Sequence, residues 1–162
     1  MKQLILVRHA KSDWNQDLPD HHRPLNPRGR DAAPAIGAWL RKNGYLPDEV
    51  LCSTAARTRE TLELLDVTAP TRFERALYHA APETMLEILK SAQGDSVMML
   101  GHNPGIAEFA EEMLQAPPDH PRFAAYPTCA TLVARFSIDD WSRLQPHSGT
   151  AQAFIVPRDL TG

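Results

Sequence analysis

The feature that most constrains the fold of this 162-residue chain is a short apolar run near its N-terminus that stops abruptly at polar side chains. The residues from Leu4 to Val7 are all aliphatic, and Arg8 and His9 follow them directly. A continuous run of this kind is typical of a strand that is buried on both faces, as in a parallel sheet. Because ligands bind at the carboxyl ends of the strands in such sheets, a guanidinium and an imidazole lie where a small anion would enter.

Short apolar runs and helical patterns alternate along the rest of the chain, which is the rhythm of an α/β domain. In the first helix we expect Asn26 as the cap, Pro27 as the first residue and Gly44 at the end, and Pro34 either kinks this helix or marks its true start. The predicted elements are a polar loop at 11–23, helices at 24–44, 55–65, 82–92 and 104–114, and strands at 49–52, 71–77 and 96–100.

The C-terminal third differs, because two predicted strands, 129–136 and 150–156, follow one another without a helical pattern between them. We therefore expect an α/β domain, spanning 1–162 as one unit, whose sheet is mostly parallel and ends in an antiparallel strand. The irregular loop 117–127 is either a rim that selects the substrate or a connection without a function of its own.

Composition excludes several classes of protein. The formal net charge is -3 and the chain has no basic run, so a nucleic-acid partner is not expected. There is no secretory signal and no apolar run of the roughly 20 residues that a membrane span needs, which favours a cytoplasmic location with no membrane partner. Cys52 and Cys129 are expected to be buried, reduced thiols. The pair His21 and His22 has no second cluster at ligand spacing, so no metal is expected.

Three predicted strand-to-helix junctions each carry a side chain that suits phosphate. They are Arg8 with His9, Arg57 in the segment STAARTRET, and His102 in GHNPG. Because parallel strands present their carboxyl ends to the same side, we expect these four residues to meet in one pocket that binds phosphate or another oxyanion. The guanidinium of arginine matches two phosphate oxygens at once, which lysine cannot do.

The GHNPG junction adds backbone groups, since Asn103 as the cap and Pro104 as the first helical residue would aim free N–H groups at the anion. The two histidines allow catalysis as well as binding. Neighbouring arginines favour the neutral, nucleophilic form of His9, and His102 can hydrogen-bond the transferring oxygens. Phosphoryl transfer depends mostly on positioning and charge stabilisation, which these residue types supply without a metal.

These residues resemble the histidine phosphatase superfamily, also called the phosphoglycerate mutase-like family, whose mark is an Arg-His-Gly triplet after the first strand. Here the triplet is Arg8, His9 and Ala10, a departure seen in the small bacterial branch of SixA-type phosphohistidine phosphatases. The resemblance continues through RPLNPRGR, STAARTRET, LYHAAPETML, GHNPG and YPT, and so covers most of the chain. It implies a three-layer α/β/α sandwich and an enzyme that uses neither a metal nor a cofactor.

The resemblance also assigns roles within the pocket. His9 matches the histidine that becomes phosphorylated, and Arg8 matches its phosphate-binding partner. Arg57 matches the second arginine, although Thr54 stands where the family often has proline, and His102 matches the second catalytic histidine.

The resemblance also points to a phosphate-contacting asparagine and to a proton donor for the leaving group. Asn15 matches a phosphate-contacting asparagine of the mutase-like members. Many members that cleave esters place an acidic proton donor after the third strand, but Glu74 comes too early and Glu83 lies in the first turn of a helix, which leaves His79 and Glu83 as the possible donors. An alkoxide leaving group needs a proton, whereas a phosphorylated imidazole leaves readily, so this pattern favours an N–P substrate.

The sequence therefore predicts a phosphohistidine phosphatase that works through a phosphohistidine enzyme intermediate. Its substrate would be a histidine-phosphorylated protein, such as a phosphotransfer or phosphorelay domain in signal transduction. Two alternatives remain open: a phosphatase for a small phosphate ester, and a non-catalytic module that binds phosphate.

Overall fold

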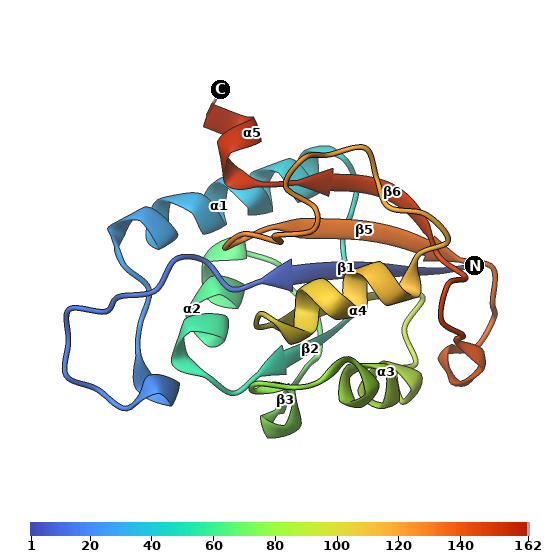
Figure 1. The fold of residues 1–162 in the computed structure, drawn as a ribbon, viewed down its shortest axis with the longest axis horizontal. Coiled ribbons are helices and arrows are strands. Elements are labelled where there is room, and N and C mark those ends of the chain that lie inside the picture. The colour runs from blue at the N-terminus through green and yellow to red at the C-terminus, as the bar shows by residue number, and fades with distance from the viewer. Residues whose placement is uncertain (162) are drawn as a thin grey trace.

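The computed structural model describes residues 1–161 and contains one sheet of six strands in the order β3-β2-β4-β1-β5-β6 (Figure 1). Neighbours among the first four strands pair in parallel, whereas β5 is antiparallel to both β1 and β6. This arrangement confirms the predicted α/β fold with a mostly parallel sheet and an antiparallel strand near its C-terminal end. The strands are β1 (Lys2–Arg8), β2 (Glu49–Ser53), β3 (Thr71–Glu74), β4 (Ser96–Gly101), β5 (Thr131–Phe136) and β6 (Thr150–Ile155).

Strand β1 lies in the middle of the sheet and is covered on both faces. Because successive side chains of a strand point to opposite faces, Leu4 and Leu6 pack into one core and Ile5 and Val7 into the other. Full burial of each such side chain contributes about 1.5–3 kcal/mol to folding. The first core contains side chains of α3 (Pro82–Lys90) and α4 (Gly105–Met113), and the second contains those of α1 (Pro27–Lys42) and α2 (Ala56–Leu65), which makes three layers.

Helix α1 begins as its sequence predicts. The Asn26 side chain accepts a hydrogen bond of 2.9 Å from the backbone N–H of Gly29, and Pro27 is the first helical residue. The helix continues through Pro34, which therefore does not mark its start, and Gly44 follows its end with a φ of 74°. A positive φ is readily adopted only by glycine, which explains why the helix stops there.

Several predicted boundaries were wrong. The third strand ends at Glu74, and the rest of the predicted segment forms a 3-10 turn, η2 (Arg75–Leu77). Strand β5 begins two residues later than expected because Cys129 has a φ of 62°, outside the range of a strand. The short helix α5 (Pro157–Thr161) was not predicted, because it buries no residue and so shows no apolar periodicity.

The two long loops have different structures. The polar loop after β1 contains a 3-10 turn, η1 (Asp20–His22), none of whose residues is fully buried. In the predicted loop 117–127, by contrast, Phe123 and Tyr126 are buried in the core. A further 3-10 turn, η3 (Trp141–Arg143), precedes β6.

Both cysteines are buried, free thiols, as expected. Burial raises the pKa of Cys52 and of Cys129 to about 12, so neither is a reactive thiolate at neutral pH. Within residues 1–161, no helix is both long and apolar enough to cross a membrane.

Candidate active site

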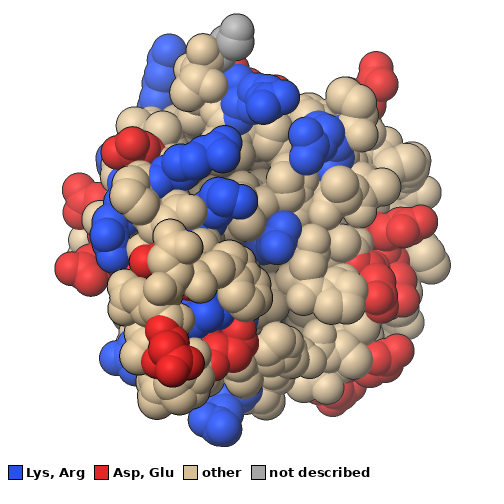
Figure 2. Space-filling model, turned by 60° about the vertical axis from the view of Figure 1, so that its left-hand side comes forward, with Lys and Arg blue, Asp and Glu red and all other residues tan. Residues whose placement is uncertain are grey.

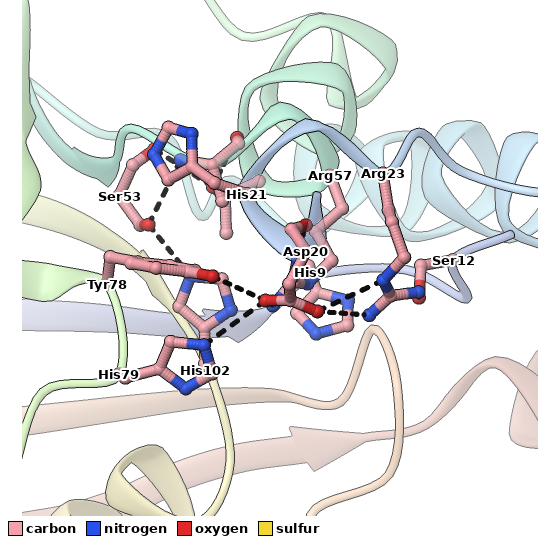
Figure 3. A network of polar contacts seen from close by, with 12 residues as sticks. His9, Ser12, Asp20, His21, Arg23, Ser53, Arg57, Tyr78, His79 and His102 are labelled. Carbon is pink, nitrogen blue, oxygen red and sulfur yellow. Dashed lines mark hydrogen bonds and ion pairs between the residues drawn. The ribbon is translucent and has the colours of Figure 1, made fainter. Parts of the chain in front are cut away.

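The carboxyl ends of three adjacent strands bring the predicted residues together. Strands β1 and β4 pair in register so that Arg8 lies opposite Gly101, and the backbone N–H of His9 donates to the Gly101 carbonyl at 3.2 Å. The ring centroids of His9 and His102 are 5.3 Å apart as a result. Arg57, in the first turn of α2 just beyond β2, completes the group (Figure 3).

His9 is held as a neutral imidazole with one free nitrogen. Its side chain is buried, and its Nδ1 lies 2.6 Å from the carbonyl oxygen of Ala10. Because a carbonyl only accepts, Nδ1 carries the proton and Nε2 keeps its lone pair. Burial, followed by the positive charges of Arg8 and Arg57, lowers the pKa of His9 to about 3. The nucleophilic form is therefore the one present at neutral pH.

His102 is also neutral and is oriented by a serine at the end of β2. Its Nε2 lies 2.7 Å from the Oγ of Ser53, which is wholly buried. Burial, together with nearby positive charge, lowers the pKa of His102 to about 2, so the ring carries a single proton. If the Ser53 hydroxyl donates to Nε2, that proton is on Nδ1, which is buried and has no hydrogen-bond partner among residues 1–161.

The two arginines each have some groups bound and others free. Arg8 donates from Nη1 to the carbonyl of Tyr126 at 3.2 Å, and Arg57 donates from Nη1 to the carbonyl of Asp20 at 2.8 Å. The Nε groups of both arginines are buried without a partner within the described chain. Burial, with Arg57 nearby, lowers the pKa of Arg8. Buried polar groups are nearly always paired in proteins, so these two N–H groups and Nδ1 of His102 are the groups that this arrangement can offer to an oxyanion.

Sequence reasoning missed the carboxylate of Asp20, which connects this pocket to its surroundings (Figure 3). Its Oδ2 accepts from Nη2 of Arg57 at 3.0 Å and from the Tyr78 hydroxyl, and lies 3.2 Å from Nε2 of His79. Its Oδ1 accepts from Nε of Arg23 at 3.0 Å. His79 was predicted from the sequence as a possible proton donor, and Tyr78, which directly precedes it, could have been found in the same way. Asp20 lies within a loop and has no such signal.

Of the other predicted site residues, Asn15 and Glu83 lie outside the group formed by His9, Arg57 and His102, and His79 lies at its edge. Asn15 is exposed in the loop after β1, where its backbone N–H donates to Asp13. Glu83 lines a groove with Arg72 and Glu74 on the outer side of β3, and this groove contains none of the pocket residues. Of the two possible proton donors, His79 is therefore the one that contacts the site.

Asn103 does not cap α4, so this part of the prediction was wrong. The helix begins at Gly105 with Pro104 in the capping position. The Asn103 amide instead donates to the carbonyls of Ala125 and Tyr126 at 3.0 and 3.2 Å. It thus ties the loop before β5 to the end of β4, while its own Oδ1 is buried and has no partner within residues 1–161.

Charge is unevenly distributed over the face toward which β1 runs. Figure 2 shows a group of Lys and Arg side chains from the upper left to the centre of this view, and Asp and Glu side chains around it at the left edge, below and along the right side. The overall charge of -3 therefore does not describe this face. Clustered positive charge raises the local concentration of anions, which suits an anionic ligand.

Comparison with known proteins agrees with this geometry. Residues 4–78 match the family described as the histidine phosphatase superfamily, branch 1. An uncharacterized protein of Mycobacterium tuberculosis is 36% identical over 160 residues, which cover 94% of this chain and 100% of the relative. The chain belongs to the histidine phosphatase superfamily.

Two solved structures of SixA proteins share the fold over nearly the whole chain. One, from Nakamurella multipartitia, is provisionally assigned as a phosphohistidine phosphatase; it is 30% identical with a TM-score of 0.82 and covers 96% of each chain. The second, from Agrobacterium tumefaciens and assigned in the same way, is 27% identical with a TM-score of 0.78 and covers 96% of this chain and 99% of the other. The chain is thus similar to SixA proteins in sequence as well as in fold.

Proposed function

We propose that this protein is a phosphohistidine phosphatase that transfers the phosphoryl group of a histidine-phosphorylated protein to His9 and then to water. The observation that carries the proposal is the Nε2 of His9, left free by the contact of Nδ1, beside three buried nitrogens that have no partner within residues 1–161: Nε of Arg8, Nε of Arg57 and Nδ1 of His102. Nε2 supplies the attacking lone pair, and the three N–H groups hold the equatorial oxygens of the phosphoryl group as their charge changes. None of these roles needs a metal ion.

A protein substrate is supported by the open edge of the site. The side chains of Asp20 and His79, which contact Arg57 and His102, are 39% and 54% exposed. Within residues 1–161, no inserted domain separates them from solvent (Figure 1). A histidine on the surface of a folded partner could therefore reach the pocket. The similarity to SixA proteins supports the same substrate class.

The test compares phosphate release from a histidine-phosphorylated protein with release from an aryl phosphate, without added metal. We expect faster release from the phosphoprotein, and loss of both activities in His9→Ala. His147→Asn is a matched control, because His147 lies beyond the far end of α4, where its backbone N–H bonds Glu112, and asparagine tolerates its φ of 59°. The control should retain native turnover. Undiminished turnover in His9→Ala would disprove the assignment of the nucleophile.

A phosphatase for small esters is the second candidate, and the position of His79 favours it. An ester leaves as an alkoxide, which needs a proton, and His79 lies at the edge of the site with an acidic partner. Faster release from the ester than from the phosphoprotein would support this alternative. A non-catalytic phosphate-binding module would bind phosphate but turn over neither substrate.

A further inference from the structure

A histidine and a carboxylate lie next to the phosphoryl pocket, and the proposed transfer from a phosphohistidine gives neither of them a role so far. The Nε2 of His79 is 3.2 Å from Oδ2 of Asp20, and the ring of His79 stacks against that of His102 with centroids 5.7 Å apart and planes 14° apart. His79 has a φ of 56°, which residues other than glycine rarely adopt. Such backbone conformations occur often at functional sites, where the surrounding structure maintains them.

The charge of Asp20 determines which nitrogen of His79 is available. Partial burial acts to raise the pKa of Asp20, but hydrogen bonds from Tyr78, His79 and Arg23 outweigh it and hold this pKa below its ordinary value. The carboxylate is therefore ionised at neutral pH and can only accept hydrogen bonds. Nε2 of His79 must then carry a proton, which leaves Nδ1 as the nitrogen that gains or loses one. Nδ1 makes no hydrogen bond to any described residue.

The groups that face His79 come from several elements. Asp20, from the turn η1, places a carboxylate oxygen 3.2 Å from its Nε2. Arg57, from α2, contacts the same carboxylate. Tyr78 and His102 pack against the ring as neutral groups. A histidine in such surroundings, with more than half of its side chain exposed, can exchange protons with both solvent and a substrate.

We infer that His79 and Asp20 form the acid–base pair of this site, in which His79 is the catalytic residue and Asp20 the positioning residue. The inference rests on the proposed phosphoryl transfer to His9. In the first step Nε2 of His9 forms a bond to phosphorus, the bond from phosphorus to the leaving group breaks, and the proton on Nδ1 of His79 passes to the leaving atom. In the second step Nδ1 takes a proton from water, the water oxygen bonds phosphorus and the bond to His9 breaks. His79 ends protonated and His9 neutral, as both began.

Leaving groups of different basicity test the role of His79. We expect His79→Gln to lower turnover about 100-fold for an alkyl phosphate, whose leaving group needs a proton, and only a few-fold for p-nitrophenyl phosphate, whose leaving group does not. Inhibition by inorganic phosphate should remain close to native in this variant, because the pocket groups on Arg8, Arg57 and His102 are intact. The matched control is His147→Asn, another histidine with a positive φ, which lies beyond the far end of α4 and should keep the native dependence on the leaving group.

Asp20→Asn tests the positioning residue. It leaves His79 in place but removes the charged acceptor of its Nε2 proton, so turnover of the alkyl phosphate should fall while turnover of p-nitrophenyl phosphate stays close to native. Native turnover of the alkyl phosphate in this variant would overturn the role of Asp20. An equal loss for good and poor leaving groups in His79→Gln would overturn the role of His79.

Failure of the inference can be distinguished from failure of the proposed function. If the native protein turns over esters but no phosphohistidine, the proposed substrate is wrong and the comparison of leaving groups still tests His79. If it turns over nothing, nitrogen NMR of the neutral imidazoles is the test. The pair predicts that His79 carries its proton on Nε2, and a proton on Nδ1 would refute it.

Discussion

Replacing Ser53 with alanine tests which nitrogen of His102 carries the proton. The Ser53 hydroxyl is wholly buried and lies 2.7 Å from Nε2 of His102. In the mechanism it donates there, so that the proton of the ring lies on Nδ1 and can be donated to a phosphoryl oxygen. Alanine removes this donor without adding bulk. The substitution therefore changes which nitrogen of His102 carries the proton, while the imidazole itself is retained.

The expected loss lies between two limits. If the ring changed tautomer completely, the site would lose one preorganised donor, which typically costs about 100- to 1,000-fold in kcat. If only the preference of a neutral hydrogen bond were lost, about 1 kcal/mol, the cost would be about fivefold. We expect Ser53→Ala to lower kcat about 10- to 100-fold. We also expect it to lower the free energy of unfolding by about 1–3 kcal/mol, because Nε2 is left buried without a partner.

The assay is steady-state phosphate release together with thermal unfolding of the same preparations. The control is Ser148→Ala, since the Ser148 hydroxyl also donates a hydrogen bond, to the carbonyl of Gln145, but this bond is exposed and far along the chain from the pocket. The control should match the native kcat. A folded Ser53→Ala protein with a kcat within twofold of native would refute the tautomer argument, and a loss confined to KM would mean that the donor acts equally on bound substrate and transition state.

Three further predictions concern stability. Burial, more than neighbouring charge, holds the pKa of His9 at about 3 and that of His102 at about 2, against 6.5 for an ordinary histidine, so below pH 6.5 the unfolded chain binds more protons than the folded one. The free energy of unfolding, measured by urea titration, should therefore fall between pH 7 and 5 by up to about 1.4 kcal/mol per pH unit for each histidine. A free energy that does not change over this range would contradict the prediction. Gly105→Ala should lower the free energy of unfolding by about 2–3 kcal/mol, because the added Cβ would overlap the carbonyl oxygen of Ala80. In the same urea titrations the control Gly44→Ala, which is strained only by its φ of 74°, should lower it by about 1 kcal/mol. Tungstate, an oxyanion that resembles phosphate, should bind the folded site and raise the unfolding temperature. At a hundredfold excess over its Kd the stabilisation should be about 2.7 kcal/mol, whereas potassium chloride of equal ionic strength should have no such effect.

The convergence of the pocket residues could be predicted because it depends only on strand ends. Arg8 and His102 follow apolar runs that are buried on both faces, and such runs indicate parallel strands whose carboxyl ends meet. The region after the third strand was predicted less completely, because His79 was named there as a possible donor but Tyr78 was not. Strand β3 is an edge strand with exposed side chains, so its apolar signal is weak.

The remaining features depend on contacts between distant parts of the chain. Asp20 meets Arg57 across 37 residues, and no local pattern marks it. Asn103 was predicted as a cap because of its residue type, but the carbonyls of Ala125 and Tyr126 bind its amide, and nothing in the local sequence indicates that contact.

The predicted loop 117–127 is better explained as a support than as a rim that selects the substrate. Tyr126 is wholly buried, and its hydroxyl donates to the carbonyl of Leu6 at 2.6 Å, next to the end of β1. Its own carbonyl accepts from both Arg8 and Asn103. The loop thus holds a guanidinium of the pocket in place from behind, which a chain of prolines, histidines and alanines does not reveal.

The charges of the site explain why both pocket histidines must be neutral. Arg8, Arg57 and Arg23 bring three positive charges, and Asp20, which pairs with Arg57 and Arg23, offsets one of them. A phosphoryl dianion can balance what remains, but a protonated His9 would add charge and lose its nucleophilic lone pair. Since the pKa of His9 is about 3, its ionisation lies far below neutral pH. A limb of the pH–rate profile between pH 5 and 8 must then come from a group other than His9, such as the substrate phosphate, whose second pKa is about 6.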